Sequence, residues 1–145
     1  MDLTEVAPQF DPELIAAMKA YLTAVDADDL DSLEPLYASD FANIRWDRRG
    51  FAANIRRETF LGFLRMWRRD GGHPEPAAEA TRICATTRYG DEGAVLVLRT
   101  KAGRVGAYTF LWRREATGWR VVRELTFQDA LPGVPDDAAP SAERL

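Results

Sequence analysis

The apolar residues of this chain change their spacing along the sequence. Between residues 11 and 26 they recur every three or four positions, which is the period of a helix with one buried face. Asp11 and Pro12 open this stretch, and both residue types favour the start of a helix. The spacing therefore predicts a helix from Pro12 onward, with Tyr21 on the edge of an apolar face formed by Leu14, Ile15, Met18, Leu22 and Val25.

Two further helices are expected in the first 70 residues. A short one should begin after Asp28 or Asp29, which can cap it. Pro35 interrupts this segment, and because proline lacks an amide hydrogen we expect two short turns rather than one rod. A third helix, ending before Gly71, is predicted from the broad apolar face formed by Phe60, Leu61, Phe63, Leu64 and Trp67.

From Phe41 onward the period changes to two, which is the period of a β-strand. Residues 41–46 and 51–56 flank a turn sequence that starts with Asp47 and ends with Gly50, so they are predicted to form a hairpin. After the third helix, glycine-containing turns separate four further strands, at about residues 78–89, 94–101, 104–114 and 119–129. These four are predicted to form an antiparallel meander.

This order of elements predicts the α+β class. The expected architecture is a cone-shaped roll, in which three N-terminal helices pack in a strongly curved, mixed but mainly antiparallel β-sheet. A chain of 145 residues needs only one core. We expect an N-terminal arm at residues 1–10, a single domain at 11–129 and a flexible C-terminal tail at 130–145, where prolines and small or acidic residues gather.

Composition narrows the classes of partner. No apolar stretch approaches the roughly 20 residues that cross a bilayer, and the start resembles no signal peptide, so we expect a cytoplasmic protein without a membrane partner. Cys84 is the single cysteine and His73 the single histidine, so neither a disulfide nor a metal site of nitrogen and sulfur ligands is expected. Carboxylates alone leave a metal site open but unsupported, and no metal or cofactor is predicted. A net charge of −4 argues against a nucleic-acid partner.

The charges are also separated along the chain. Residues 1–40 hold ten acidic side chains against Lys19 alone, whereas residues 45–69 hold eight arginines against two acids. These two segments are expected to attract each other. Alternatively, the arginine-rich segment presents a solvated or dimer-facing basic surface.

Two stretches resemble the nuclear transport factor 2-like superfamily. They are YLTAVDADDLDSLEPLYASDF at residues 21–41 and the closing strand that starts at Gly118-Trp119, and the likeness extends over residues 11–129. Members of that superfamily include ketosteroid isomerase, scytalone dehydratase, polyketide cyclases and many non-catalytic binding modules. The resemblance therefore implies a fold with an apolar hollow between helix and sheet, but it does not imply one reaction.

Ketosteroid isomerase offers a residue-by-residue comparison. Tyr21 falls where that family has the tyrosine that donates to the developing oxyanion, and Tyr108 falls at the second donor, an aspartic acid in the family. The family's general base falls at Arg45, which accepts no proton. Asp47 shares the strand face of Arg45 and could replace the base if the hairpin bends inward, although as a turn residue it favours bonds to backbone amides. The resemblance thus implies Tyr21, Asp47 and Tyr108 as catalytic candidates.

Alternation along the final strands predicts the residues that face a ligand. Arg123 falls on the predicted inward face of the last strand, together with Trp119, Val121, Leu125 and Phe127. A buried guanidinium is costly unless paired, so Arg123 should meet an acid such as Asp47 or Asp26, or anchor an anionic or carbonyl ligand. The predicted ligand-binding residues are Arg45, Trp46, Phe110, Trp112, Arg123, Leu125 and Phe127.

Two classes of function remain. In the first, a homodimer binds a small, mainly apolar molecule bearing a carbonyl or carboxylate, with or without isomerase, cyclase or dehydratase activity. In the second, aromatic side chains fill the hollow and the chain is a non-catalytic homodimerisation or protein-interaction module. The volume of the hollow discriminates between them, because ordinary ligand sites measure about 300 Å³ or more and less than roughly 100 Å³ would exclude binding.

Overall fold

The computed structural model describes residues 9–72, 77–129, 131, 134–135 and 137–139. The helical elements are α1 (Pro12–Asp26), α2 (Leu30–Leu33), a 3₁₀ turn η2 (Glu34–Leu36) and α3 (Arg57–Arg69). The strands are β1 (Tyr37–Asp47), β2 (Ala52–Arg56), β3 (Ala80–Tyr89), β4 (Glu92–Lys101), β5 (Arg104–Glu115) and β6 (Gly118–Gln128). His73 and most of the expected N-terminal arm lie outside the described residues.

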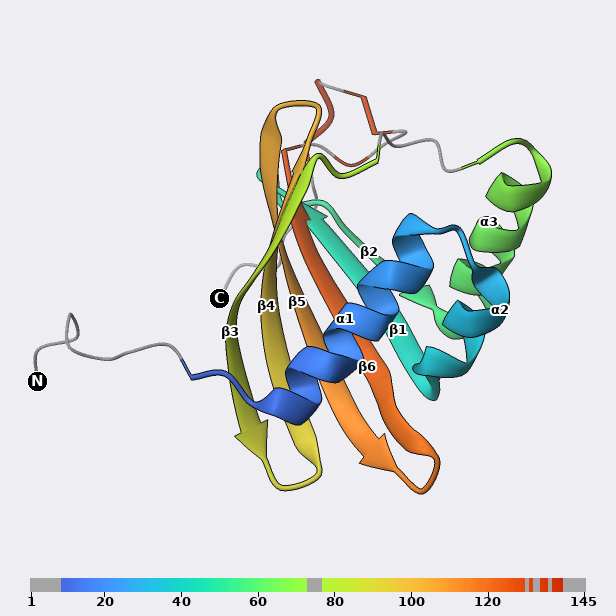
Figure 1. Ribbon diagram of the computed structural model, residues 1–145. Coiled ribbons are helices and arrows are strands. Elements are labelled where there is room, and N and C mark those ends of the chain that lie inside the picture. The colour runs from blue at the N-terminus through green and yellow to red at the C-terminus, as the bar shows by residue number, and fades with distance from the viewer. Residues whose placement is uncertain (1–8, 73–76, 130, 132–133, 136, 140–145) are drawn as a thin grey trace, which may run out of the picture.

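All six strands belong to one sheet, in the order β2-β1-β6-β5-β4-β3. Strands β1 and β6 pair in parallel, and the other neighbouring pairs are antiparallel. Helix α1 runs across one face of this sheet, with α2 and α3 at the side of β1 and β2 (Figure 1). The predicted α+β class and the mixed, mainly antiparallel sheet are therefore confirmed. Among the described residues, no helix is long and apolar enough to cross a membrane.

Local sequence signals explain where the first helices begin. The Asp11 carboxylate accepts a hydrogen bond from the Leu14 amide at 3.0 Å, and Pro12 occupies the first turn of α1. Asp29 caps α2 in the same way, through the Ser32 amide at 3.2 Å. Pro35 lies in η2, so the second helical segment is split as predicted.

The core lies between α1 and the covered face of the sheet. Its largest fully buried side chains include Leu14 and Met18 from α1 and Phe110 and Trp112 from β5. Gly93 on β4 is required for this packing, because a Cβ atom there would lie 2.5 Å from a methyl group of Leu14. The absence of that side chain lets α1 approach the sheet closely.

A β-bulge in β6 changes which residues of that strand face the helices. Leu111 pairs with Arg123 but the next residue, Trp112, pairs with Val121, so Val122 is an extra residue on β6. Such an insertion reverses the alternation of side chains beyond it. Val121 is buried in the core, and after the bulge the buried positions are Glu124 and Thr126.

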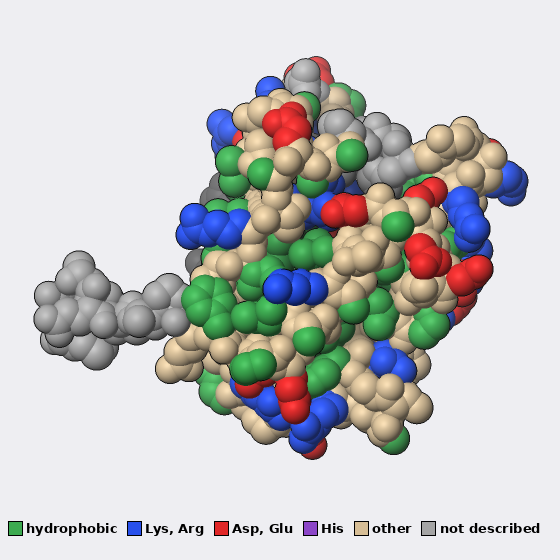
Figure 2. Space-filling model, viewed as in Figure 1, with side chains coloured by type: hydrophobic (Ala, Val, Ile, Leu, Met, Phe, Trp, Pro, Cys, Tyr) green, Lys and Arg blue, Asp and Glu red, His purple; other side chains and the backbone are tan. Residues whose placement is uncertain are grey.

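Charged side chains gather around the N-terminal end of α1. Arg88 pairs with Glu13 at 3.0 Å, and Arg114 pairs with Asp91 at 2.6 Å. Acidic and basic side chains accordingly intermix at the lower end of the helix-bearing face (Figure 2). Contacts at Glu34 join the acidic and arginine-rich segments: Arg65 of α3 donates to the Glu34 carboxylate at 2.8 Å, and Arg57 donates to the Glu34 backbone oxygen at 3.3 Å.

Candidate functional site

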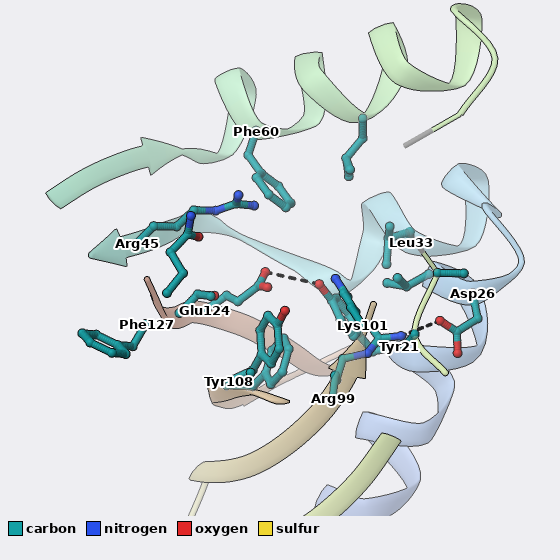
Figure 3. A pocket seen from close by; sticks show the side chains of 18 of the residues that line it. Tyr21, Asp26, Leu33, Arg45, Phe60, Arg99, Lys101, Tyr108, Glu124 and Phe127 are labelled. Carbon is teal, nitrogen blue, oxygen red and sulfur yellow. Dashed lines mark hydrogen bonds and ion pairs between the residues drawn. The ribbon is translucent and has the colours of Figure 1, made fainter. Parts of the chain in front are cut away.

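A cavity of about 840 Å³ lies between the helices and the sheet. Its apolar walls come from all three helices and from β5, and they include Val25, Leu30, Leu33, Phe60, Leu64 and Phe110. The volume lies within the range of about 300–1,000 Å³ that small-molecule sites occupy. Figure 3 shows Phe60 and Leu33 reaching toward this space from α3 and α2.

Polar groups converge on one wall of the cavity, at Glu124 of β6. The Tyr21 hydroxyl donates to Glu124 Oε2 at 3.4 Å (Figure 3). It also lies 2.9 Å from the Tyr37 hydroxyl. All three side chains are buried and line the cavity. Helix α1, the start of β1 and the strand beyond the β6 bulge thus bring three proton-carrying groups together.

Burial shifts the pKa values of all three side chains. It raises the pKa of Glu124, while the nearby Arg45, Asn43 and Tyr21 side chains oppose the rise. Burial also raises the pKa of Tyr21 and of Tyr37 well above the usual tyrosine value, and the Glu124 charge adds to both shifts. Both phenols therefore remain hydrogen-bond donors at neutral pH, and Glu124 is the group that can exchange a proton.

Cationic side chains line other parts of the same cavity. Arg45 of β1 donates through Nε to the Asn43 amide oxygen at 2.8 Å. Arg99 of β4 pairs with Asp26 of α1 at 2.6 Å, and the Lys101 ammonium lies 5.5 Å from the centre of the Tyr108 ring. Within the described residues, no group of three or more His, Cys, Asp or Glu side chains is arranged to hold a metal ion.

Five of the residues predicted from the sequence line the cavity. They are Tyr21, Arg45, Tyr108, Phe110 and Phe127. Trp112 lies deeper in the core, where its ring meets Tyr21 edge to face at a centroid distance of 6.3 Å. The roles predicted for these residues stay predictions, but their positions fit a ligand site.

Asp47 does not line the cavity. Its carboxylate accepts hydrogen bonds from the backbone amides of Arg49 at 2.9 Å, Phe51 at 3.2 Å and Leu131 at 2.9 Å. Burial alone would raise the pKa of Asp47, but these bonds and the Arg49 guanidinium lower it. The expected inward replacement for the general base is therefore corrected: Asp47 organises the turn after β1 and holds Leu131 beside it.

The prediction that Arg123, Leu125 and Phe127 face the helices is also corrected. Arg123 donates to the backbone oxygens of Asp40 and Val122, each at 2.7 Å, and it does not line the cavity. Leu125 likewise lies on the opposite face of the sheet. Trp46 and Phe127 pack against each other there at a centroid distance of 5.8 Å, although Phe127 also borders the cavity. The bulge at Val122 explains why these residues lie on the other face, because the prediction assumed that side chains alternate along an uninterrupted strand.

Sequence reasoning missed Glu124, Tyr37, Arg99 and Lys101. For Glu124 one signal was available. A buried carboxyl can take up a proton and become neutral, whereas a buried arginine stays charged. Placing Glu124 in the interior therefore costs less free energy than placing Arg123 there.

Comparisons with known proteins place this geometry in a fold family. No protein-family sequence model matches the chain, and no curated protein sequence is significantly similar to it. Many solved structures do match it. One is a nuclear transport factor 2-like protein of unknown function from Silicibacter pomeroyi, at 18% identity and a TM-score of 0.61, covering 79% of this chain and 91% of that one.

Two other structures carry activity-related descriptions. A proposed dehydratase of the same family from Streptomyces avermitilis matches at 13% identity and a TM-score of 0.59, covering 82% of this chain and 95% of that one. A ketosteroid isomerase-like protein from Erwinia carotovora atroseptica matches at 26% identity and a TM-score of 0.53, covering 81% and 97% respectively. The chain therefore has the nuclear transport factor 2-like fold.

Proposed function

We propose that this protein binds a small, mainly apolar molecule bearing a carbonyl or carboxylate in the cavity between its helices and sheet. The observation that carries the proposal is the cavity itself, about 840 Å³ in volume and lined by apolar walls around the Tyr21–Glu124 contact. The volume is far above the roughly 100 Å³ below which ligand binding would be excluded. Apolar surface supplies affinity in such sites, and a few fixed polar groups orient the ligand.

The same groups support cofactor-independent acid–base chemistry of the isomerase, cyclase or dehydratase type. In its ionised form Glu124 can take a proton from a carbon next to a carbonyl and later return it. Tyr21, hydrogen-bonded to Tyr37, can donate to the oxygen on which negative charge develops. Glu124 pairs with Asn43 in the sheet, so β6 supplies a carboxyl beside the β1 position where Arg45 replaces the family's base. The neighbours described as a proposed dehydratase and as ketosteroid isomerase-like support this class.

A thermal-shift screen tests the binding proposal. Aromatic and terpenoid acids, ketones and their neutral isosteres are added to the wild type and to Tyr21→Phe. A ligand at 100 times its Kd stabilises the native state by about 2.7 kcal/mol, or roughly 5–10 °C for a chain of this size. We expect such shifts to shrink in Tyr21→Phe but to persist in Tyr89→Phe, whose side chain is exposed. No shift across the panel would contradict the proposal.

The uncovered face of the sheet favours a second role, homodimerisation. Trp46, Leu96 and Phe127 are 37%, 38% and 43% exposed there, and Trp46 packs against Phe127, so this face presents apolar surface of the kind that interaction sites use. Burying this face against a second copy is compatible with the ligand site and is also the core of the alternative, non-catalytic module. Sedimentation of the wild type should show a dimer, and Trp46→Lys should shift it to the monomer. A monomeric wild type would contradict this role.

A further inference from the structure

Asn43 of β1 is the buried neighbour of Glu124 in the sheet. The two residues are partners in the parallel pairing of β1 with β6, so their side chains leave the sheet on the same face. Asn43 has no exposed surface, and Glu124 is 8% exposed. The carboxyl of the acid–base role proposed above, on which this inference rests, therefore lies beside a buried amide.

The orientation of the Asn43 amide is fixed at one end. Its oxygen accepts a hydrogen bond from Arg45 Nε at 2.8 Å. Because a guanidinium only donates, the atom that meets it must be the oxygen, and the amide nitrogen is turned away from Arg45. Within the part of the chain that the structure describes, this buried nitrogen has no acceptor at hydrogen-bond distance and angle. A buried donor without an acceptor costs free energy, so its presence calls for an explanation.

Glu124 is the acceptor that this nitrogen lacks. The Asn43 amide is near enough to lower the pKa of Glu124, which means that it favours the ionised carboxylate. In the structure the carboxyl accepts from the Tyr21 hydroxyl instead, over a long 3.4 Å (Figure 3). A carboxylate offers about four lone-pair sites, so it can accept from both donors at once.

The remaining groups act on Glu124 through charge. Arg45 of β1 and Lys101 of β4 attract its charge, and the same charge raises the pKa of Tyr37 at the start of β1. Attraction between charges favours the ionised form of Glu124, whereas a hydrogen bond also sets the direction in which the carboxylate points. Asn43 and Tyr21 are therefore the neighbours that orient this carboxyl.

We propose that Asn43 is the positioning residue of Glu124: its amide nitrogen donates to the ionised carboxylate and so frees the Tyr21 hydroxyl for the oxygen of the ligand. In the proposed reaction a C–H bond beside the ligand carbonyl breaks, and its proton forms an O–H bond on Glu124. The electron pair moves to the carbonyl oxygen that Tyr21 holds. The Asn43 hydrogen bond aims the carboxylate at that proton, weakens once Glu124 is neutral, and returns when the proton goes back to carbon.

Nuclear magnetic resonance of the wild type tests this hydrogen bond without a variant. The chain has two asparagines, Asn43 and Asn54, so isotope-labelled asparagine gives two side-chain amide signals. We expect the Asn43 amide protons to shift with pH at the midpoint of the labelled Glu124 carboxyl, whose signal is assigned by its loss in Glu124→Gln. The amide of Asn54, which is exposed, should not follow that midpoint. An Asn43 signal that is also indifferent to it would overturn the proposal.

Two variants measure how much each donor contributes. Asn43→Leu removes the amide at similar volume, and we expect it to raise the titration midpoint of Glu124 by about one pH unit or more, because a hydrogen bond to a charged group is lost. Tyr21→Phe should raise the midpoint by less than about half a pH unit, since its bond is long. Asn54→Leu is the matched control and should leave the midpoint unchanged. The wild-type spectra decide the question if Asn43→Leu fails to fold.

The outcomes separate this proposal from the ligand site. A merely structural Asn43 would lower the melting temperature in Asn43→Leu and leave the Glu124 midpoint in place, which overturns the positioning role while the ligand site stands. A larger rise in Tyr21→Phe than in Asn43→Leu would also overturn it, because Tyr21 would then be the donor that Glu124 cannot spare. None of these measurements needs a ligand, so a thermal-shift screen without any shift refutes the ligand site independently.

Discussion

Glu124 is buried on β6, so its ionisation places a negative charge away from water and costs the folded protein free energy. Replacement by glutamine keeps the shape of the side chain and an oxygen that can accept from the Tyr21 hydroxyl. It removes the ionisation. The variant therefore isolates the electrostatic cost of this carboxyl from its packing.

The direction in which folding stability changes with pH follows from the raised pKa of Glu124 in the folded state. Below the ordinary glutamate pKa of 4.5, which applies to the unfolded chain, both states are protonated and Glu124 adds no pH dependence to the stability. Above it the unfolded chain releases its proton first, so folding stability falls as the pH rises toward the folded pKa. The slope from this one group reaches about 1.4 kcal/mol per pH unit.

Denaturant unfolding of the wild type and Glu124→Gln between pH 4.5 and 8 measures this difference. We expect the variant to gain stability relative to the wild type with rising pH, after losing at most about 0.5–1.5 kcal/mol at pH 4.5 from the altered hydrogen bond. Glu58→Gln serves as the control, since that side chain is 76% exposed. Parallel pH profiles for the wild type and Glu124→Gln would refute the reasoning.

Three further predictions concern the corrected and confirmed parts of the structure. Asp47→Ala leaves three backbone amides without their acceptor, so its melting temperature should fall by roughly 5–10 °C; an unchanged melting curve would contradict the turn-organising role. Arg123→Met should alter acid affinity by less than about twofold in calorimetry, because Arg123 bonds backbone carbonyls away from the cavity; a tenfold loss would place it in the site after all. Phe110→Ala should cost about 3–5 kcal/mol in denaturant unfolding, as expected for a buried aromatic ring, and a loss below 1 kcal/mol would be inconsistent with its packing.

The helices and the order of strands could be predicted because their signals are local. Asp11 and Pro12 mark a helix start through bonds within one turn, and Pro35 breaks a helix by its own chemistry. The turn at Asp47 was recognisable for the same reason. A turn residue of this type favours bonds to backbone amides, as noted from the sequence, and the Asp47 carboxylate makes such bonds in the structure.

The inward residues of β6 could not be predicted by alternation. A bulge depends on pairing with neighbouring strands, and nothing in the spacing of Val121, Val122 and Arg123 reveals one. One extra residue moves Arg123 to the outer face and brings Glu124 into the cavity. The polar centre of the candidate site is therefore a consequence of sheet register, which is a property of the tertiary structure.

The central claim is that the cavity beside Tyr21 and Glu124 is a ligand site. A crystal structure of the protein grown with the most strongly stabilising acid of the screen tests it most directly. The account predicts density for the ligand between the helices and the sheet, with its polar groups near Tyr21 and Glu124. An empty cavity, with the acid bound on the outer face around Trp46 and Phe127, would contradict it.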